Sequence, residues 1–409
     1  MTERIALLPD RIIDTVDGTV LTDRAVLVED DRVADVVATA DVPDGPRRID
    51  LAGHTLLPGL MDMHSHLAGE EEHGQGYAAL VMRNGAQEAI VGVRNARLIL
   101  EAGFTTVRDV GSFRAFTDVA IREGIEAGWF PGPRMLCAGC YVTCPGGGGD
   151  ITGLAVDMDG VVPAELRFGV TSGVDQMRAN VRRIIARGAD LIKIIATGAV
   201  LTSGTNPGAP EFTEDELRAA VEECDLLGAH VAAHAHGPEG IKRASRAGVR
   251  SVEHASLIDD EGIAMLAEHG TYLVADVYDG DWINEAGARD GWPAETMAKN
   301  VQTTEAQRAA FGKAVAAGVR IAYGTDSGVY PHPMVAIQLG YQVRLGQTPL
   351  QALRSATLTA AELMGWEDRV GSLRPGRFAD LVAVRSDPLE GIDVLRHPAT
   401  VVKGGVRVD

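Results

Sequence analysis

The sequence lacks the features that would place the protein in a membrane or on nucleic acid. It contains no run of about 18 apolar residues, the length at which a membrane-spanning helix becomes a candidate. Positive charge is in deficit: the formal net charge is -19 at pH 7, whereas a surface that binds phosphates or anionic lipids is basic. Low-complexity runs are also missing, so no long disordered region is expected. We therefore expect neither a nucleic acid nor a membrane as a partner.

The start of the chain lacks a basic segment followed by an apolar run. Residues 1–20 are therefore expected to form strands rather than a signal peptide, and the protein is expected to be cytoplasmic. Cysteine is scarce, and three of the four cysteines, Cys137, Cys140 and Cys144, follow a C-x2-C-x3-C spacing. This spacing is compatible with a zinc or redox cluster, or with reduced cysteines on and just after a buried strand. A structural zinc site needs four ligands and no fourth is evident, so the second interpretation is favoured.

The length of 409 residues suits one large α/β barrel of about 250–300 residues with a smaller attachment. Both chain ends alternate short apolar runs with turn signals, and Gly404-Gly405 between two valines predicts a hairpin. We expect residues 1–57 and 365–409 to form one small β-sandwich domain, with residues 58–364 inserted between its halves. The strands expected in it span residues 4–8, 25–29, 32–37, 54–57, 380–384 and 400–408.

The inserted region has a different pattern, in which strand-like apolar runs alternate with helical segments, and this predicts a parallel sheet. Eight such runs occur, and no Gly-x-Gly-x-x-Gly motif opens a helix after the first. We therefore expect an α/β fold of the (β/α)8 TIM-barrel type rather than a doubly wound sheet. Thr213 and Glu216 form a capping box at the start of one helix. The expected strands span residues 60–63, 104–107, 134–138, 191–195, 230–233, 249–252, 271–275 and 319–323, and the helices include 87–101, 173–187, 213–227 and 303–317.

The polar residues that could carry chemistry follow the expected strands. His64 and His66 end the first strand, and because residues two apart in a strand point to the same side, both imidazoles can share one metal ion. His234 and His254 end two later strands, and Asp326 follows the last. Taken singly, such a histidine is more often an ordinary hydrogen-bonded residue, and such an aspartate is usually a helix cap. All five occur where barrel enzymes carry their active sites, so together they predict a metal centre.

Lys193 lies inside one of the expected buried strands, flanked by aliphatic residues. An unpaired buried ammonium costs several kcal/mol, so this lysine needs a partner or a chemical change. Burial lowers the pKa of a lysine, and the resulting neutral amine can take up CO2 to form a carbamate. A carbamate is an anion with two oxygens, which can bridge two cations about 3.5–4 Å apart. We therefore expect Lys193 to be a carbamylated metal ligand.

Together these residues resemble the ligand set of the amidohydrolase superfamily. The resemblance covers nearly the whole chain and includes residues 55–60 and 371–381. Residues 232–237, 253–257 and 323–328 are similar to the prolidase-like branch of metal-dependent dipeptidases. That branch includes enzymes that release C-terminal lysine or arginine from dipeptides and N-acyl amino acids. The ligand set consists of His64, His66, Lys193, His234, His254 and Asp326.

The resemblance implies two divalent metal ions, for which we expect zinc, and a metal-bound hydroxide that attacks an amide carbonyl. His64 and His66 would hold the more buried ion together with Asp326, which would also be the catalytic proton shuttle. Lys193 would bridge both ions as a carbamate. The second ion would be held by His234 and His254.

One departure from the branch lies in the turn at residues 144–150. Those dipeptidases usually carry a histidine in a Gly-Gly-His turn that polarises the scissile carbonyl, whereas this sequence has Gly148 at that position. Because glycine has no side-chain donor, backbone N–H groups or the metal would have to polarise the carbonyl. Tyr278 occupies the place of a tyrosine that contacts substrate in the branch, and the alternative for it is an ordinary packed aromatic residue.

Three further positions are candidates for substrate contact. His236 could face the barrel interior beside His234, or it could orient a ligand or a loop. His332, in a Pro-His-Pro sequence after the last strand, lines the pocket or belongs to a plain surface loop. An acidic cluster at residues 70–73 is either a solvated loop or a recognition site for a cationic substrate side chain.

These observations predict a metal-dependent amidohydrolase, dipeptidase- or carboxypeptidase-like, that cleaves the amide bond of a dipeptide or an N-acyl amino acid. Its partners would be a small-molecule substrate and further copies of itself in a homo-oligomer. The alternative enzyme, which the departure at Gly148 supports, hydrolyses other amides, carbamates or ureas at the same site. A catalytically inactive barrel that acts as a binding module would have lost ligands, whereas all six are present.

Overall fold

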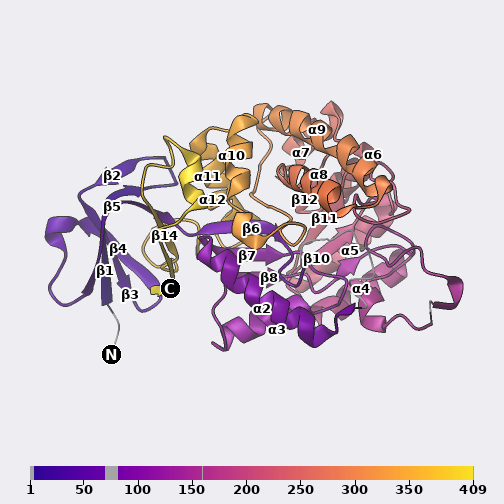
Figure 1. Ribbon diagram of the computed structural model, residues 1–409, viewed down its shortest axis with the longest axis horizontal. Coiled ribbons are helices and arrows are strands. Elements are labelled where there is room, and N and C mark those ends of the chain that lie inside the picture. Colours follow the sequence, from indigo (N-terminus) through magenta and orange to yellow (C-terminus); the bar gives the residue numbers. More distant parts are fainter. Residues whose placement is uncertain (1–3, 70–81, 159, 409) are drawn as a thin grey trace.

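The computed structural model describes residues 4–69, 82–158 and 160–408. A β-sheet lies at one end of the molecule and a larger part, rich in helices, lies at the other (Figure 1). The acidic cluster at residues 70–73 lies outside the described residues, so its role stays a prediction. None of the described helices is long and apolar enough to cross a membrane.

Both chain ends contribute to one eight-stranded sheet. β1 (Arg4–Ile13) runs parallel to β5 (Arg47–Pro58), and β14 (Leu381–Val384) is antiparallel to β5 on its other side. β15 (Thr400–Lys403) and β16 (Val406–Val408) form the hairpin that the sequence predicts at its glycine pair. The strand order is β16-β15-β14-β5-β1-β3-β4, with β2 beside β1. The remaining strands are β2 (Val20–Thr22), β3 (Arg24–Glu29) and β4 (Arg32–Ala38).

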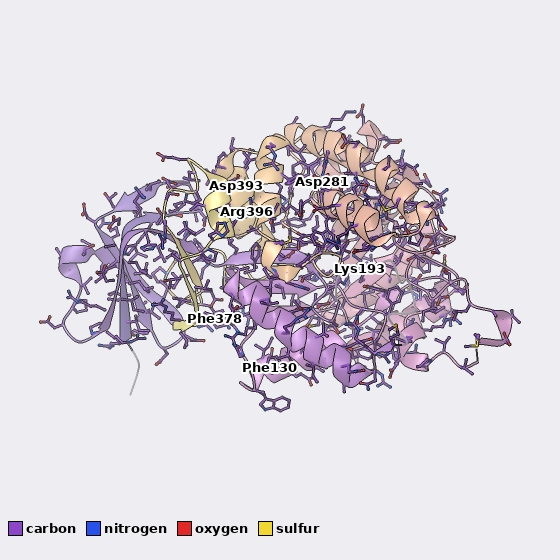
Figure 2. The ribbon with its side chains drawn as sticks, in the orientation of Figure 1. Phe130, Lys193, Asp281, Phe378, Asp393 and Arg396 are labelled. Carbon is purple, nitrogen blue, oxygen red and sulfur yellow. The ribbon has the colours of Figure 1, made fainter. Side chains whose placement is uncertain are left out.

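The sheet is joined closely to the larger part. Only Gly59 separates β5 from the first strand of that part, and a Cβ there would lie 2.1 Å from Thr105 Oγ1, so the close approach requires glycine. Arg134 of the larger part forms an ion pair of 2.7 Å with Asp380 of the sheet side. The guanidinium of Arg134 also lies 3.4 Å from the ring centre of Phe378, which is labelled in Figure 2. These contacts fix the two parts against each other.

The larger part alternates parallel strands with helices, as predicted. β6 (Leu60–Ser65), β7 (Phe104–Asp109) and β8 (Arg134–Cys137) form one parallel set. A second parallel set has the order β13-β12-β11-β10-β9. Its strands are β9 (Tyr141–Val142), β10 (Ile192–Ile195), β11 (Val231–Ala235), β12 (Ser251–His254) and β13 (Tyr272–Val274).

Backbone contacts join the two sets on both sides. Next to β8 and β10, the N–H of Asp190 donates to the carbonyl of Cys137 over 2.7 Å. On the other side, residues 319–323, the expected eighth strand, lie between β13 and β6. There Ile321 forms a single parallel bridge with Leu273, and Ser327, just beyond the segment, forms another with Ser65. These isolated bridges stand in place of a continuous ladder. The expected position of this strand is confirmed, but its pairing is less regular than the apolar run predicts.

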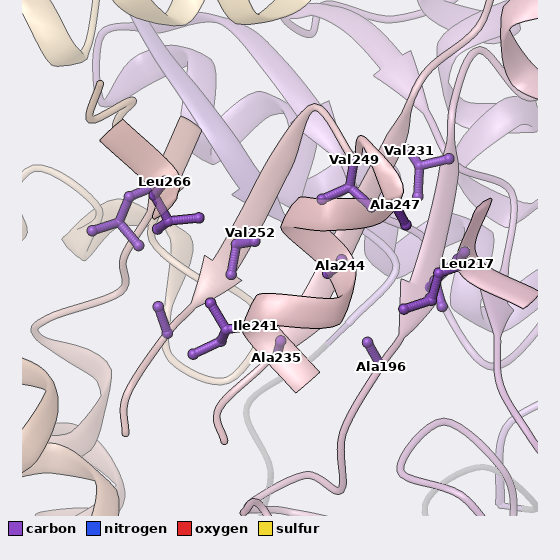
Figure 3. Close-up of a cluster of buried hydrophobic side chains, with 14 of the residues drawn as sticks. Ala196, Leu217, Val231, Ala235, Ile241, Ala244, Ala247, Val249, Val252 and Leu266 are labelled. Atoms are coloured by element: carbon purple, nitrogen blue, oxygen red, sulfur yellow. The ribbon is translucent and has the colours of Figure 1, made fainter. Parts of the chain in front are cut away.

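Helices cover the outside of these strands (Figure 1). Figure 3 shows how one of them packs: Ile241, Ala244 and Ala247, which recur every three residues on α6, lie in one buried cluster with Val231 and Val252 of the strands. The helices are α2 (Gly85–Glu101), α3 (Thr117–Glu126), α4 (Val174–Ile185), α5 (Glu214–Leu227), α6 (Pro238–Ala247), α7 (Asp260–His269), α8 (Asp279–Asp290), α9 (Ala294–Ala316), α10 (Ile337–Arg344), α11 (Pro349–Ser355) and α12 (Leu358–Met364).

Helix α9 shows where the sequence pattern was incomplete. The expected helix began at residue 303, whereas α9 begins at Ala294. Its first half buries polar residues, among them Lys299, Asn300 and Thr304, so the apolar periodicity that marks a helix is hidden there. By contrast α5 begins at the predicted capping box, with the N–H of Glu216 donating to Thr213 Oγ1.

Candidate functional site

The histidines singled out in the sequence come together at one end of the parallel strands. His64 lies near the end of β6, while His234 and His254 lie at the ends of β11 and β12. The ring centre of His254 lies 4.8 Å from that of His64 and 4.5 Å from that of His234. His66, just past β6, lies 5.3 Å from His64 between ring centres. The carboxyl ends of neighbouring parallel strands meet at one edge, which is why residues so far apart in sequence share one site.

Asp326 and Lys193 complete this cluster. Asp326 Oδ1 lies 3.1 Å from His66 Nε2 and 3.5 Å from His64 Nε2. Lys193 Nζ lies 3.5 Å from His64 Nε2, and the lysine is 1% exposed, inside the larger part of the molecule (Figure 2). The structure therefore brings all six residues of the predicted ligand set into one place.

His236 also belongs to the cluster. Ligand atoms of His234, His236 and His254 lie within 4.8 Å of one another, and the same holds for His64, His254 and Asp326. Because His254 is common to both groups, the two groups adjoin. This position agrees with the prediction that His236 faces inward beside His234. Its Nδ1 is paired with Ser256 Oγ at 2.8 Å.

One nitrogen of each clustered histidine is held by a protein acceptor. His64 Nδ1 donates to Glu253 Oε2 over 2.9 Å, and His254 Nδ1 donates to Asp276 Oδ2 over 2.8 Å. A carboxylate can only accept, so the proton of each ring lies on Nδ1. The other nitrogen, Nε2, is then unprotonated and available as a ligand.

His66 and His234 are held by backbone carbonyls. His66 Nδ1 donates to the carbonyl of Gly111 over 2.6 Å, and His234 Nε2 lies 3.3 Å from the carbonyl of Gly198. A metal-binding histidine almost always has its second nitrogen fixed in this way. Imidazole nitrogens with one carboxylate are also a donor set that suits zinc and similar divalent ions. The residues of this cluster therefore fit a metal centre.

Glu253 is the most deeply buried of these supporting groups, and it predicts a measurable effect. Its carboxylate is 0% exposed and also accepts from Arg108 Nη2 over 2.8 Å. In Glu253→Gln the acceptor of His64 becomes neutral, and an amide NH2 faces the arginine. We expect the affinity for a divalent ion to fall by about 10–100-fold, measured by titration of metal-depleted protein.

Glu223→Gln provides the matched control, because Glu223 is 3% exposed and pairs with Arg182 over 2.7 Å on the outer helices. We expect its metal affinity to equal that of the unmodified protein. Equal affinities for both variants would show that Glu253 does not orient a ligand.

The backbone at the site adopts conformations that are rare outside glycine. His254, Ala255 and Asp326 have φ values of 67°, 50° and 58°. The left-handed region costs about 1–3 kcal/mol for such residues and persists where the surrounding structure enforces it, often at functional sites. Asp and His tolerate it better than most residues, which helps to place these two residue types here.

Burial sets the protonation of the cluster. Burial lowers the pKa of Lys193 to about 8, although the nearby carboxylates of Glu253 and Asp326 oppose this shift. Burial, together with the charge of Lys193, also holds the pKa of His64 well below its usual value. For Asp326, burial alone would raise the pKa, but the neighbouring His64 and His66 hold it below its usual value. The imidazole of His64 is thus neutral and the carboxylate of Asp326 ionised, the forms that bind cations.

Sequence reasoning missed the residues that support the ligands. Asp276, which fixes His254, follows the strand expected at residues 271–275, so the strand-end signal used for the histidines also applied to it. Gln307 donates to Asp276 Oδ1 over 2.7 Å from α9. Gln307 lies on a buried polar helix face and had no comparable signal. Ligand atoms of Asp276, Asp279 and Asp326 lie within 4.8 Å of one another, which extends the site on its acidic side.

The turn that departs from the family pattern offers no donor at Gly148. Its N–H donates to both oxygens of Glu211 over 2.9 Å. A Cβ at this position would lie 3.0 Å from Ile195 Cγ2 and 3.1 Å from Ala199 Cβ, so the position has little room for a side chain. The expectation that backbone N–H groups polarise the carbonyl therefore does not hold for Gly148 itself, because the half-buried carboxylate of Glu211 already occupies its N–H.

Two weaker candidates, Tyr278 and His332, lie in packed surroundings. Tyr278 is 8% exposed, and its ring contacts those of Tyr330 and Tyr341, with centres 5.1 and 5.2 Å away. His332 is 3% exposed and lines a cavity of about 260 Å³, so the surface-loop alternative for it is wrong. Burial, together with the smaller effect of the charge of nearby His66, lowers the pKa of His332 to about 3.

The cysteines take no part in this site. Cys137, Cys140 and Cys224 are buried, Cys144 is half-buried, and all are reduced. Burial raises the pKa of each thiol, for example to about 11 for Cys144. No metal-binding group found among the described residues contains cysteine. This agrees with the interpretation of the C-x2-C-x3-C spacing as buried, inert thiols.

Comparison with known proteins agrees with this geometry. Residues 55–408 match the amidohydrolase family. The chain is 32% identical to the ochratoxinase of Aspergillus niger over 409 residues, which cover 95% of this chain and 83% of that protein. A solved Xaa-Pro dipeptidase with methionine bound in its active site is 35% identical, with a TM-score of 0.93 and 99% of both chains covered. A solved prolidase complexed with N-methylphosphonate-L-proline is 29% identical, with a TM-score of 0.90 and 99% of both chains covered.

Proposed function

The chain belongs to the amidohydrolase family, and on this basis we propose that it is a binuclear enzyme that cleaves the amide bond of a dipeptide or an N-acyl amino acid. It is a metal-dependent amidohydrolase of the prolidase-like branch. Six polar groups from widely separated parts of the chain converge on one place, and this supports the binuclear site most directly. One nitrogen of each clustered histidine is already fixed by the protein.

In this proposal the ligand set divides between two ions. His64, His66 and Asp326 would hold one ion, His234 and His254 would hold the other, and a carbamate on Lys193 would serve both. The neutral amine that carbamylation requires is favoured by a lysine pKa of about 8, which leaves about one side chain in ten uncharged at pH 7. When bound, two such ions lower the pKa of a water molecule toward about 7 and polarise a carbonyl.

Asp326 moves the proton in the proposed reaction. Its ionised carboxylate takes a proton from the attacking water and passes it to the leaving nitrogen of the amide. Oδ1 lies 3.1 Å from His66 Nε2 and 3.5 Å from His64 Nε2, so these imidazoles keep the carboxylate oriented and ionised. Deep burial of the surrounding residues excludes bulk water, which strengthens each of these interactions.

We further propose that the parallel strands close into a (β/α)8 barrel across residues 58–364. The backbone contacts beside β8 and the bridges of residues 319–323 support this closure. Residues 1–57 and 365–409 would then form the separate β domain, in which side chains from both ends, such as Leu7, Leu56 and Val402, share one buried cluster. Assembly into a homo-oligomer is part of the same proposal.

A substrate panel tests the proposed activity. We expect dipeptides and N-acyl amino acids, with proline and methionine among the residues released, to be hydrolysed with kcat/KM at least about tenfold above that for aryl amides, carbamates and ureas. Such a margin corresponds to about 1.4 kcal/mol of transition-state discrimination. Release of the amino acid is measured by chromatography. A preference for carbamates or ureas would contradict the proposed substrate class while leaving the hydrolytic site intact.

Removal of metal tests the centre itself. We expect about two divalent ions per chain by elemental analysis. Dialysis against a chelator should abolish hydrolysis, and added zinc should restore it. Retained activity in a chain shown to contain no metal would contradict the proposal.

Hydrolysis of other amides, carbamates or ureas is the second candidate function. The observation that favours it is the absence of a side-chain donor at Gly148, whose N–H is taken by Glu211. A substrate whose carbonyl does not need a hydrogen bond from this position could then be hydrolysed at the same site. The panel above distinguishes the two candidates directly.

A further inference from the structure

We propose that Gln307 is a positioning residue, which fixes His254 and thereby sets the affinity of the site for the second metal ion. This inference rests on the proposed binuclear site. Gln307 is 5% exposed, and its amide nitrogen Nε2 donates to two acceptors. One is the backbone carbonyl of His254, at 3.2 Å, and the other is Asp276 Oδ1, at 2.7 Å. A side-chain amide nitrogen carries two hydrogens, so one group can serve both acceptors at once.

The backbone at His254 has a conformation that needs support from outside its own strand. His254 has a φ of 67°. The N–H of Ala255 donates along the sheet to Ala235 over 3.0 Å and also back to the carbonyl of Glu253 over 2.8 Å. A hydrogen bond between residues two apart, with a positive φ between them, is typical of the rare and strained form of the γ-turn. Such strain persists only where the surrounding structure enforces it, and the bond from Gln307 holds the peptide group that follows His254.

The same amide also holds the ring of His254, through Asp276. Asp276 Oδ2 accepts from His254 Nδ1 over 2.8 Å, while its other oxygen, Oδ1, accepts from Gln307. The three residues therefore form a closed ring of hydrogen bonds. Within it, Gln307 fixes both the backbone of His254 and the carboxylate that orients its imidazole. Residues that orient a metal-binding histidine in this way control the affinity for the metal.

Helix α9 carries Gln307 on a polar face that is anchored at other points as well. Lys299 Nζ donates to the carbonyl of Thr202 over 2.8 Å, and Asn300 Nδ2 donates to the carbonyl of Gly280 over 2.9 Å. These bonds attach α9 to the segment that follows β10 and to the start of α8, which follows β13. Because the helix is fixed by contacts besides its own, Gln307 presents a donor whose position is set before a metal ion binds.

Gln307→Met tests the proposal, because methionine is similar in length to glutamine and has no N–H. Metal-depleted protein is titrated with Zn²⁺ in a calorimeter, which measures the affinity of each binding step. In the proposed site one ion has a carboxylate ligand, whereas the other has only the histidines His234 and His254, so its binding is the weaker step. We expect Gln307→Met to lower the affinity of this weaker step by about 10–100-fold and to leave the tighter step unchanged.

Gln342→Met is the matched control. Gln342 is a glutamine of α10 that is 0% exposed, and its Oε1 accepts from Ser355 Oγ over 3.1 Å. The same substitution there should lower the thermal stability without changing either binding step, which separates a positioning role from a general loss of stability. If Gln307→Met does not fold, Gln307→Asn takes its place. It keeps the amide but is one methylene group too short to reach both acceptors, and we expect the weaker step to lose about tenfold in affinity.

Two results would overturn the proposal. One is an unchanged weaker step in the Gln307 variant. The other is an equal loss at both steps, or a loss of the same size in Gln342→Met, because either would show that Gln307 supports the fold and not His254 in particular. If the unmodified protein binds fewer than about two ions per chain, the proposed binuclear site itself fails, and that result is known before any variant is compared.

Discussion

Replacing Asp326 by asparagine is expected to lower kcat by about 10²–10⁴-fold, because an amide cannot take up and release the proton that the carboxylate transfers. The substitution is well suited to the position. Asp326 has a φ of 58°, and asparagine tolerates this left-handed conformation as readily as aspartate does. The amide oxygen can still face His66 and His64, so metal content should remain close to that of the unmodified protein.

The experiment combines steady-state kinetics with elemental analysis of the same preparation. Asp23→Asn is the matched control, because Asp23 is an exposed aspartate with a φ of 54° in the β-sheet at the other end of the molecule. It makes the same chemical change in nearly the same backbone conformation and should have no effect on rate. If Asp326→Asn kept its metal and turned over near the original rate, the proton-transfer role would be wrong.

Replacing Lys193 by alanine is expected to remove most of the bound metal and with it the activity. The carbamate is the proposed ligand that both ions share, so its loss should weaken both sites. Loss of several kcal/mol of transition-state stabilisation corresponds to about 10²–10³-fold or more in rate. Because the vacated space lies beside His64, a short carboxylic acid such as propionate should enter it, replace the missing anion and restore part of the metal content and the rate.

Lys403→Ala is the control for this variant. Lys403 is the other lysine whose pKa burial lowers to about 8, and its amine donates to the carbonyl of Gly132 far from the histidine cluster. The control should keep its metal and activity and should not respond to propionate. Full activity of Lys193→Ala without any added acid would falsify the proposed bridge. Mass spectrometry of the native protein, which detects the added mass of CO2, provides a second and independent measurement.

The two variants separate the parts of the proposed mechanism. Asp326→Asn tests proton transfer with the metals in place, whereas Lys193→Ala tests the assembly of the metals. Because these residues share one site, their effects are not expected to add, and double variants should cost less than the product of the single losses.

The ligand set could be predicted from the sequence because its signal is local. Each ligand except Lys193 stands at or just after the end of an apolar run, and the strand ends of a barrel meet at one face regardless of how the loops are arranged. His64 and His66 needed only the two-residue period of a strand. Lys193 was recognisable because an ammonium among aliphatic residues has no ordinary explanation. The capping box at Thr213 and the hairpin at Gly404-Gly405 were local in the same way.

The supporting residues were outside the reach of such reasoning. Arg108 of β7 and Glu253 of β12 form a buried ion pair, and nothing near either residue in the sequence predicts this pairing.

By itself the sequence determined the chemistry available to this protein: which residues can bind a cation, and which strand ends carry them. The tertiary structure decided which nitrogen of each imidazole is available, since this depends on the acceptor that holds the other one. It also decided that the N–H of Gly148 is occupied by Glu211. The physical reason is the range of the interactions. The alternation of apolar and polar residues can be recognised within a few neighbouring positions of the sequence. Hydrogen-bond partners and burial, by contrast, depend on groups that come together only when the chain folds.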